Sequence, residues 1–167
     1  MKLFAIILLL LSQVPKANAQ YTIRVDLRNS FQACTSKEKI ESFHSQLFDS
    51  KSNDAIFYGY QGAVTALKAK YSSNPLKKYN FCKAGLYTIS NAIAKSPADL
   101  ELRYLRLVIE SNIPSFLGMN CNIKEDKNII INKIEHEKDL HLKKMISSFL
   151  LKSDICTDKE KKLLALN

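Results

Sequence analysis

Arg103 and Arg106 are the side chains of this sequence best suited to hold an anion. They are three residues apart in a predicted helix, so both project from the same side of it. A guanidinium group can bind both oxygens of a carboxylate or phosphate group, which an ammonium group does less well. Asn112 and Phe116 follow closely and are expected to form the rim of a pocket. These four residues are therefore candidate binding residues, and the alternative is a helix surface covered by ion pairs.

A second candidate site lies between Asp54 and Asp99, where the chain has six lysines, five of its seven tyrosines and no acidic residue. Aromatic faces beside cations suit sugars, anionic glycans or single-stranded nucleic acid. The alternative is that the tyrosines fill contacts between helices and keep their hydroxyl groups at the edge. The candidate residues of this span are Lys68, Lys70, Lys77, Lys78, Tyr60 and Tyr71.

No motif of the sequence predicts an enzyme, a metal site or a cofactor. His136 and His141 are five residues apart, so on a helix they point about 140° away from each other and are poorly placed to grip one metal ion. No Gly-x-Ser-x-Gly turn and no glycine-rich phosphate loop occur. Neighbouring carboxylates such as Glu125 and Asp126 stand among lysines, as on a solvated helix surface. The sequence therefore favours a protein that is not an enzyme, with a hydrolase using two carboxylates distant in sequence as the alternative.

Residues 1–19 have the pattern of a secretory signal peptide. A short basic start precedes the apolar run Leu3–Leu11, and small residues on both sides of Asn18 form a cleavage site. The run is shorter than the ~20 apolar residues of a membrane-spanning helix. We therefore expect residues 20–167 to form one exported domain. The absence of Asn-x-Ser/Thr motifs favours the periplasm or outer surface of a Gram-negative bacterium.

The exported part carries a positive net charge. Without Lys2 and Lys16 of the leader it has 23 basic residues against 16 acidic ones, a net charge of +7. A positive protein is attracted to anionic surfaces. We expect an envelope protein or peptide as its partner, with an anionic glycan or lipid surface as the alternative. Nucleic acid does not suit an exported chain.

The exported part also contains an even number of cysteines and no Cys-x-x-Cys motif. In an oxidising compartment this predicts two disulfides, with three possible connectivities. Cys121 precedes and Cys156 follows two predicted antiparallel helices, which favours a Cys121–Cys156 bridge. The second bridge would then be Cys34–Cys82, and the alternative is four buried free thiols.

Apolar residues mostly recur every three or four positions, and the chain has only four glycines and four prolines. This predicts an all-α domain of about seven helices in antiparallel hairpins, as a tetratricopeptide-like array or an irregular bundle. The first segment after the leader fits either a strand or a helix, and we favour the helix. The other helices are expected over about 36–48, 54–71, 75–95, 97–109, 123–134, 139–151 and from 158 onward.

Short motifs indicate where these helices begin and how two of them pack. Threonine followed three residues later by glutamate forms a capping box, in which each side chain accepts a hydrogen bond from a free backbone N–H group. The expected caps are Thr35, Asn53 or Asp54, Asn74, Ser96 and Thr157. Small residues at Gly59, Gly62, Ala63 and Ala66 predict a close approach of a second helix. Phe116 and Leu117 are expected to be two buried anchors of the turn at Gly118.

One helical hairpin resembles a tetratricopeptide repeat. Gly85, Ile89, Ala92 and Pro97 have the spacing found in the second helix of that repeat. Stable arrays of this kind usually contain three or more repeats. The resemblance therefore implies one tetratricopeptide-like hairpin and no more.

A second resemblance covers most of the exported chain. It rests on motifs within 53–63, 74–78, 101–106, 111–118 and 122–127. These are similar to a family of small exported helical proteins of Bacteroidota. The resemblance implies a helical architecture and a place in the cell envelope, and it brings no catalytic residues.

The sequence thus predicts an exported, non-enzymatic helical module that binds a protein or peptide near residues 54–116. The first alternative is a cell-envelope hydrolase that uses a pair of carboxylates. The second alternative is a binder of anionic glycan or lipid that uses Lys68–Lys83.

Overall fold

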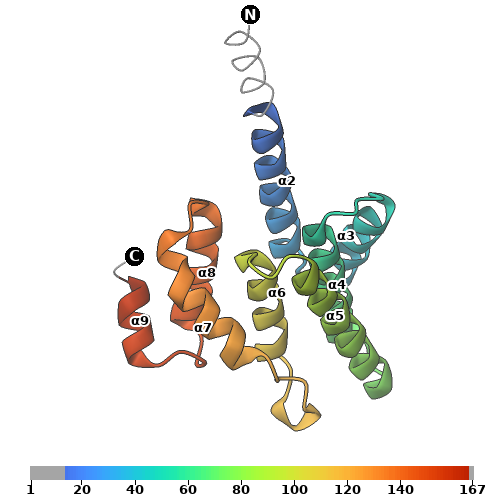
Figure 1. Cartoon of the computed structure of the whole chain (residues 1–167). Helices are drawn as coiled ribbons and strands as arrows, with labels where there is room; N and C mark the ends of the chain where they lie inside the picture. Colours follow the sequence, from blue (N-terminus) through green and yellow to red (C-terminus); the bar gives the residue numbers. More distant parts are fainter. Residues whose placement is uncertain (1–13, 166–167) are drawn as a thin grey trace, which may run out of the picture.

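The computed structural model describes residues 14–165, and over these residues the fold is all-α, as predicted. The predicted signal-peptide run Leu3–Leu11 lies outside the described residues. The helix favoured for the segment after the predicted leader is confirmed as α2, which begins at Val14, within the predicted leader (Figure 1). The helices are α2 (Val14–Gln32), α3 (Lys37–Asp49), α4 (Ala55–Leu67), α5 (Pro75–Lys95), α6 (Leu100–Ser111), α7 (Ile123–Lys133), α8 (Leu140–Lys152) and α9 (Asp158–Ala165), with 3-10 turns η1 (Lys68–Tyr71), η2 (Ser115–Leu117) and η3 (Ile134–His136).

Helix α6 lies in the middle of the fold, between two apolar clusters (Figure 1). Its residues Leu102 and Leu105 pack in the first cluster with side chains from α2, α3, α4 and α5. Tyr104 and Leu107 pack in the second cluster with side chains from α7, α8 and α9. Because both sides of α6 are covered, most of its side chains are buried, and these include charged ones.

Three predicted helix caps are confirmed. The side chains of Asp54 and Asn74 accept hydrogen bonds from the backbone at the starts of α4 and α5. Before α9, the Thr157 hydroxyl accepts from the N–H group of Glu160, and the Glu160 carboxylate accepts from the N–H group of Thr157. This is the reciprocal arrangement of a capping box.

Two predicted caps are wrong by a few residues. The cap of α3 is Ser36 and not Thr35, because the Ser36 hydroxyl accepts from the backbone of the first turn. The cap of α6 is Asp99 and not Ser96. The N–H group of Ser96 still bonds back to α5, so this residue belongs to the end of the preceding helix. In both cases the true cap is a polar residue slightly further along the chain, one residue after Thr35 and three residues after Ser96.

Helices α4 and α5 meet at two glycines, as the small residues of α4 predict. A Cβ atom at Gly85 would lie 2.5 Å from the carbonyl oxygen of Gly62 and 2.8 Å from Cβ of Ala66. Such distances are below any van der Waals contact, so the two backbones approach this closely only because both residues lack a side chain. The α4–α5 hairpin is therefore held at a fixed separation.

Gly85→Ala is expected to lower the free energy of unfolding by about 1–3 kcal/mol, although alanine favours a helix over glycine. The added methyl group meets backbone atoms of α4, which move only if the two helices separate. Gly59→Ala is the matched control, because a Cβ atom there meets the side chains of Leu102 and Leu105 and no backbone atom. Urea unfolding of both variants checks this, and equal losses would contradict it.

The four cysteines are free thiols, and neither predicted disulfide is formed in this structure. The predicted α7–α8 hairpin exists, but Cys121 is exposed in the loop before it, whereas Cys156 is buried in the second cluster. Cys34 donates to the carbonyl oxygen of Ser30 and, like Cys82, packs against the first cluster. Burial raises the pKa of the Cys34, Cys82 and Cys156 thiols.

The expectation of two buried anchors in the turn at Gly118 is half wrong. Leu117 packs against the first cluster, but Phe116 is 85% exposed. Side chains that are adjacent in a 3-10 turn point about 120° apart, so only one of the two can face the core. Gly118 then ends the turn with a φ of 65°, in the left-handed region that glycine adopts without strain.

Glu101 is a fully buried carboxylate that joins α2, α4 and α6. Arg28, also fully buried, donates to it from Nε and Nη2 at 2.8 and 2.7 Å, and Arg24 donates from Nη1 at 2.9 Å. The Tyr60 hydroxyl donates at 2.6 Å. Burial and the charge of Glu101 together raise the pKa of Tyr60. Arg28 also pairs with Asp139 before α8 at 2.7 Å, so it connects α2 to both halves of the fold.

Candidate functional site

Arg103 and Arg106, the first candidate pair, hold a carboxylate that belongs to the chain itself. The Asp126 carboxylate, fully buried, accepts from Nε and Nη2 of Arg106 at 2.6 and 2.8 Å. Arg103 donates to the same group from Nη1 at 2.9 Å and to Glu125 at 3.0 Å. Burial would lower the pKa of Arg106, but the bonds and charge of Asp126 outweigh it and raise this pKa. The bidentate geometry expected here is therefore used to join α6 to α7.

The other predicted residues of that corner lie apart from the arginines. Asn112 ends α6 and donates from Nδ2 to the Val108 carbonyl oxygen at 2.8 Å. Phe116 stands exposed on the loop that follows. Tyr60, predicted with the lysine span, is fully buried against Glu101. None of the three lines the pocket at the predicted lysine span.

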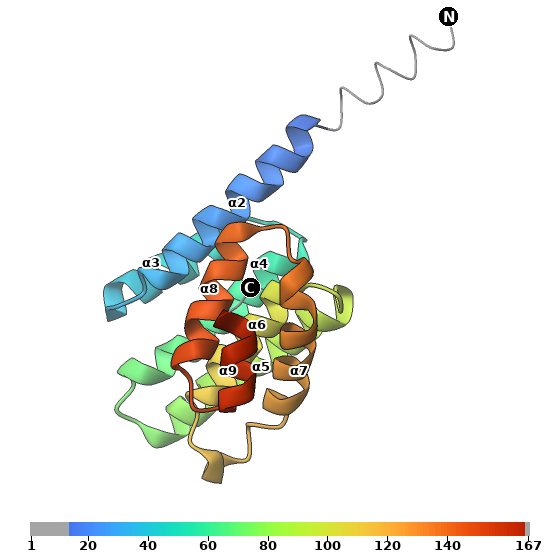
Figure 2. The ribbon, with the colours of Figure 1, turned by 90° about the vertical axis from the view of Figure 1, so that its left-hand side faces the viewer.

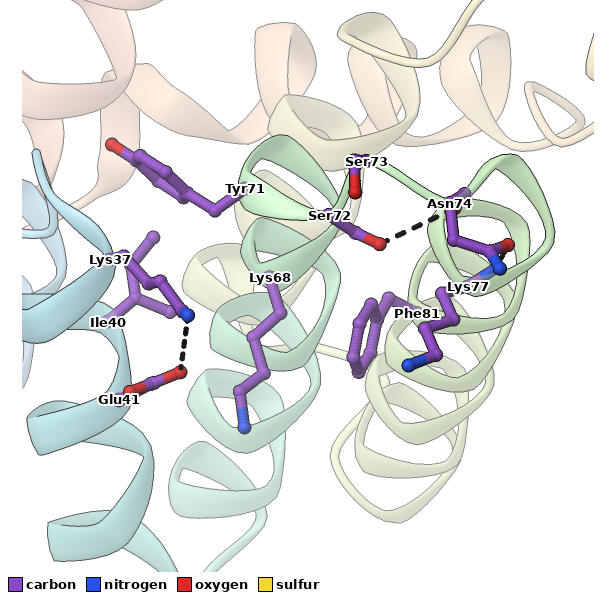
Figure 3. A pocket seen from close by; sticks show the side chains of 10 residues that line it. All are labelled: Lys37, Ile40, Glu41, Lys68, Tyr71, Ser72, Ser73, Asn74, Lys77 and Phe81. Carbon is purple, nitrogen blue, oxygen red and sulfur yellow. Dashed lines mark hydrogen bonds and ion pairs between the residues drawn. The ribbon is translucent and has the colours of Figure 1, made fainter.

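Three lysines and two aromatic rings surround a pocket of 280 Å³ between α3, η1 and the start of α5 (Figure 3). Lys37 comes from α3, Lys68 from η1 and Lys77 from α5. Phe81 lies between Lys68 and Lys77, and Tyr71 lies near α3 (Figure 3). We call this site the lysine pocket; its full lining is Lys37, Ile40, Glu41, Lys68, Tyr71, Ser72, Ser73, Asn74, Lys77 and Phe81.

Local hydrogen bonds give the lysine pocket its shape. The Tyr71 hydroxyl donates to the Thr35 carbonyl oxygen at 2.7 Å, which fixes η1 against the turn between α2 and α3. The Asn74 side chain accepts from the N–H group of Lys77 at 3.1 Å and so starts α5 at the opposite wall. The Gly62–Gly85 contact sets the distance between α5 and the helix that leads into η1. The two walls are therefore positioned without any ligand.

The lysine pocket is electrostatically positive. Its single acid, Glu41, lies 4.0 Å from Lys37 on the exposed side of α3. The ammonium groups of Lys68 and Lys77 form no ion pair with any residue that the structure describes. Partial burial and the nearby charge of Lys68 lower the pKa of His44, one helix turn beyond Glu41. An anionic group placed between the three lysines would thus meet a net positive charge.

The lysine span of the sequence contributes unequally to this pocket. Lys68, Lys77 and Tyr71 line it, whereas Lys70 and Lys78 are exposed outside it, with Lys70 lying 5.6 Å from the centre of the Tyr71 ring. Sequence reasoning missed the lining residues Lys37 and Phe81. Lys37 stands on another helix, 31 residues before Lys68, and only the folding of α3 against η1 brings it close.

Neither a metal site nor a membrane span is found in the part of the chain that the structure describes. Within residues 14–165, no three His, Cys, Asp or Glu side chains stand close enough together to hold a metal ion. Within the same residues, no helix has both the length and the apolar character needed to cross a bilayer.

No protein-family model, curated protein or solved structure matches this chain. The class of protein is therefore defined by fold and site alone. It is an all-α protein with a positive, aromatic-lined surface pocket.

Proposed function

We propose that this chain is a non-enzymatic helical binding module that holds an acidic segment of a protein or peptide in the lysine pocket. The observation that carries the proposal is the convergence of Lys37, Lys68 and Lys77 from three elements, with a single carboxylate among them. Ammonium groups attract carboxylates and keep adaptable geometry, which suits a peptide whose acidic side chains vary in position. Tyr71 and Phe81 add apolar surface beside the charges.

Two of the carboxylates are unsuited to the alternative of a hydrolase. Glu101 and Asp126 are fully buried, and each is held by two arginines. A carboxylate that acts as general acid or base must reach a substrate and exchange a proton with it. Groups so enclosed and neutralised stabilise the fold instead.

An anionic glycan is the second candidate ligand for the same pocket. Tyr71 and Phe81 favour it, because aromatic faces beside cations suit sugar rings. Export to the periplasm or outer surface, and kinship with the small exported proteins of Bacteroidota, stay predictions from the sequence and agree with either ligand.

Fluorescence anisotropy with a labelled hexaglutamate peptide tests the proposal. We expect binding that weakens as salt is added, because exposed charges are screened. Lys68→Gln/Lys77→Gln should weaken it about tenfold, since each exposed ion pair contributes roughly 0.2–1 kcal/mol. Lys144→Gln/Lys152→Gln removes the same charge from exposed positions on α8 and should leave the affinity nearly unchanged.

Two results would decide against an acidic peptide. Equal weakening by both double variants would mean that net charge, and not the pocket, attracts the peptide. Tighter binding of tri-galacturonic acid than of hexaglutamate, with the same dependence on Lys68 and Lys77, would assign the pocket to an anionic glycan.

A further inference from the structure

The turn that joins η1 to α5 forms an exposed, positively charged tip. Residues 70–80, which we call the basic tip, are exposed throughout except for Ser72. They include three lysines, no acid and Leu76, which is 67% exposed. Tyr71 and Tyr79, in the same segment, are each 37% exposed. The first turns of α5 thus extend beyond the apolar cluster that buries the rest of the helix.

A second protrusion presents another exposed apolar side chain. Residues 112–122, which we call the Phe116 loop, contain no charged residue and carry Phe116 at 85% exposure. Both views of the ribbon place this loop and the basic tip at the end of the molecule away from the start of α2 (Figures 1 and 2). Single exposed apolar residues are common on proteins. Two on separate protrusions at one end, one of them among lysines, form a distinct pattern.

From this pattern we propose that the basic tip and the Phe116 loop dock together on an anionic lipid surface, with Leu76 and Phe116 inserted among the headgroups. Lysines attract anionic lipids, and each one near the surface strengthens binding about fivefold. Tyrosine rings favour the interface, and long lysine side chains reach back to the headgroups. The surface would hold the protein reversibly, because only two apolar side chains enter it.

Charge and shape favour a lipid surface over other occupants. A second copy of the chain would place the lysines of one tip against those of the other, and like charges repel. A protein partner would need a surface that fits two separate protrusions at once, whereas a fluid bilayer adapts its shape to both. The basic tip shares residues 71–74 and Lys77 with the lining of the lysine pocket, but Lys70, Lys78 and the two apolar anchors lie outside that lining, so the two sites can be tested separately.

Tryptophan reporters give a local test, because the chain contains no tryptophan. We would prepare Leu76→Trp and Phe116→Trp, with Leu140→Trp as the control. Leu140 is 76% exposed and begins α8, at the end of the molecule near α2 (Figure 1). Vesicles of equal parts phosphatidylglycerol and phosphatidylcholine should shift the emission of the first two variants to shorter wavelength. Lipids brominated in their acyl chains should quench it, and the control should show neither effect.

A charge variant completes the test. Lys70→Gln/Lys78→Gln should weaken partition into the same vesicles about thirty-fold, at about fivefold per lysine. Lys144→Gln/Lys152→Gln should leave it nearly unchanged. All replaced side chains are exposed, so the variants should keep the thermal stability of the parent, measured by circular dichroism.

Several outcomes would overturn the proposal. A response of Leu140→Trp in place of the two reporters would mean that the opposite end, near α2, contacts the lipid. A spectral shift of Leu76→Trp with hexaglutamate and not with vesicles would assign the tip to an acidic protein. A shift that grows with protein concentration in the absence of lipid would assign it to self-association.

Discussion

Asp126→Asn is expected to lower the free energy of unfolding by about 3–5 kcal/mol, the cost of breaking a buried ion pair from one side. The substitution removes the anion that Arg106 binds directly and one of its two strong acceptors, so that one neutral amide oxygen and a long bond to Ser90, at 3.4 Å, remain in a site that is nearly closed to water. The total free energy of unfolding of a stable domain is about 5–15 kcal/mol, so this substitution would remove much of the stability. Urea unfolding followed by circular dichroism measures the change.

Glu125→Gln is the matched control for this prediction. Glu125 is the next residue before Asp126 and pairs with the same Arg103 at 3.0 Å, but its side chain is 58% exposed. An exposed pair of this kind contributes about 0–1 kcal/mol. A loss from Glu125→Gln as large as that from Asp126→Asn would show that burial is not what makes the pair strong.

The second large effect is expected for Glu101→Gln, at about 3 kcal/mol of unfolding free energy. The loss should be smaller than for Asp126→Asn, because Arg28 keeps Asp139 and Arg24 keeps Asp99 as anionic partners. The loss should still be large, because Arg24, Arg28 and Tyr60 all donate to this carboxylate and would lose its negative charge. The same unfolding measurement applies.

A double variant tests whether the stability lost in Glu101→Gln comes from the ion pair between Glu101 and Arg28. Once Arg28→Met has removed the buried cation, adding Glu101→Gln should cost much less than it does alone, since the two groups lie 2.7 Å apart. Glu41→Gln, which removes an exposed carboxylate with a partner 4.0 Å away, should change stability by less than about 1 kcal/mol. Additive losses for Arg28 and Glu101 would contradict the coupling.

The local structure of this protein could be read from its sequence to a large extent. Helix α5 begins and ends at the predicted residues, because Asn74 and Pro75 mark its start and a second polar segment follows Lys95. The close approach of α4 and α5 was also predictable, since two glycines in a helix are costly unless a neighbour needs the space. Such features depend on residues that are neighbours along the chain.

The candidate site was only partly predictable, because its parts come from distant segments. Lys68, Lys77 and Tyr71 follow from a stretch without acids, but Lys37 reaches the pocket from another helix. Arg103 and Arg106 were correctly placed on one side of a helix. The spacing of residues gave no indication that Asp126, some 20 residues further on, would be buried between Arg103 and Arg106.

The position of Arg24 and Arg28 has a consequence for the order in which the fold is completed. Synthesis releases the N-terminus first, yet their carboxylate partner Glu101 follows 77 and 73 residues later. Among its described residues, helix α2 buries one apolar side chain, Leu27, and packs a second, Phe31, partly buried against Tyr60, so few apolar contacts hold it in the absence of Glu101. Contacts so distant in sequence form late. We therefore infer that α2 docks only after the start of α6 is in place.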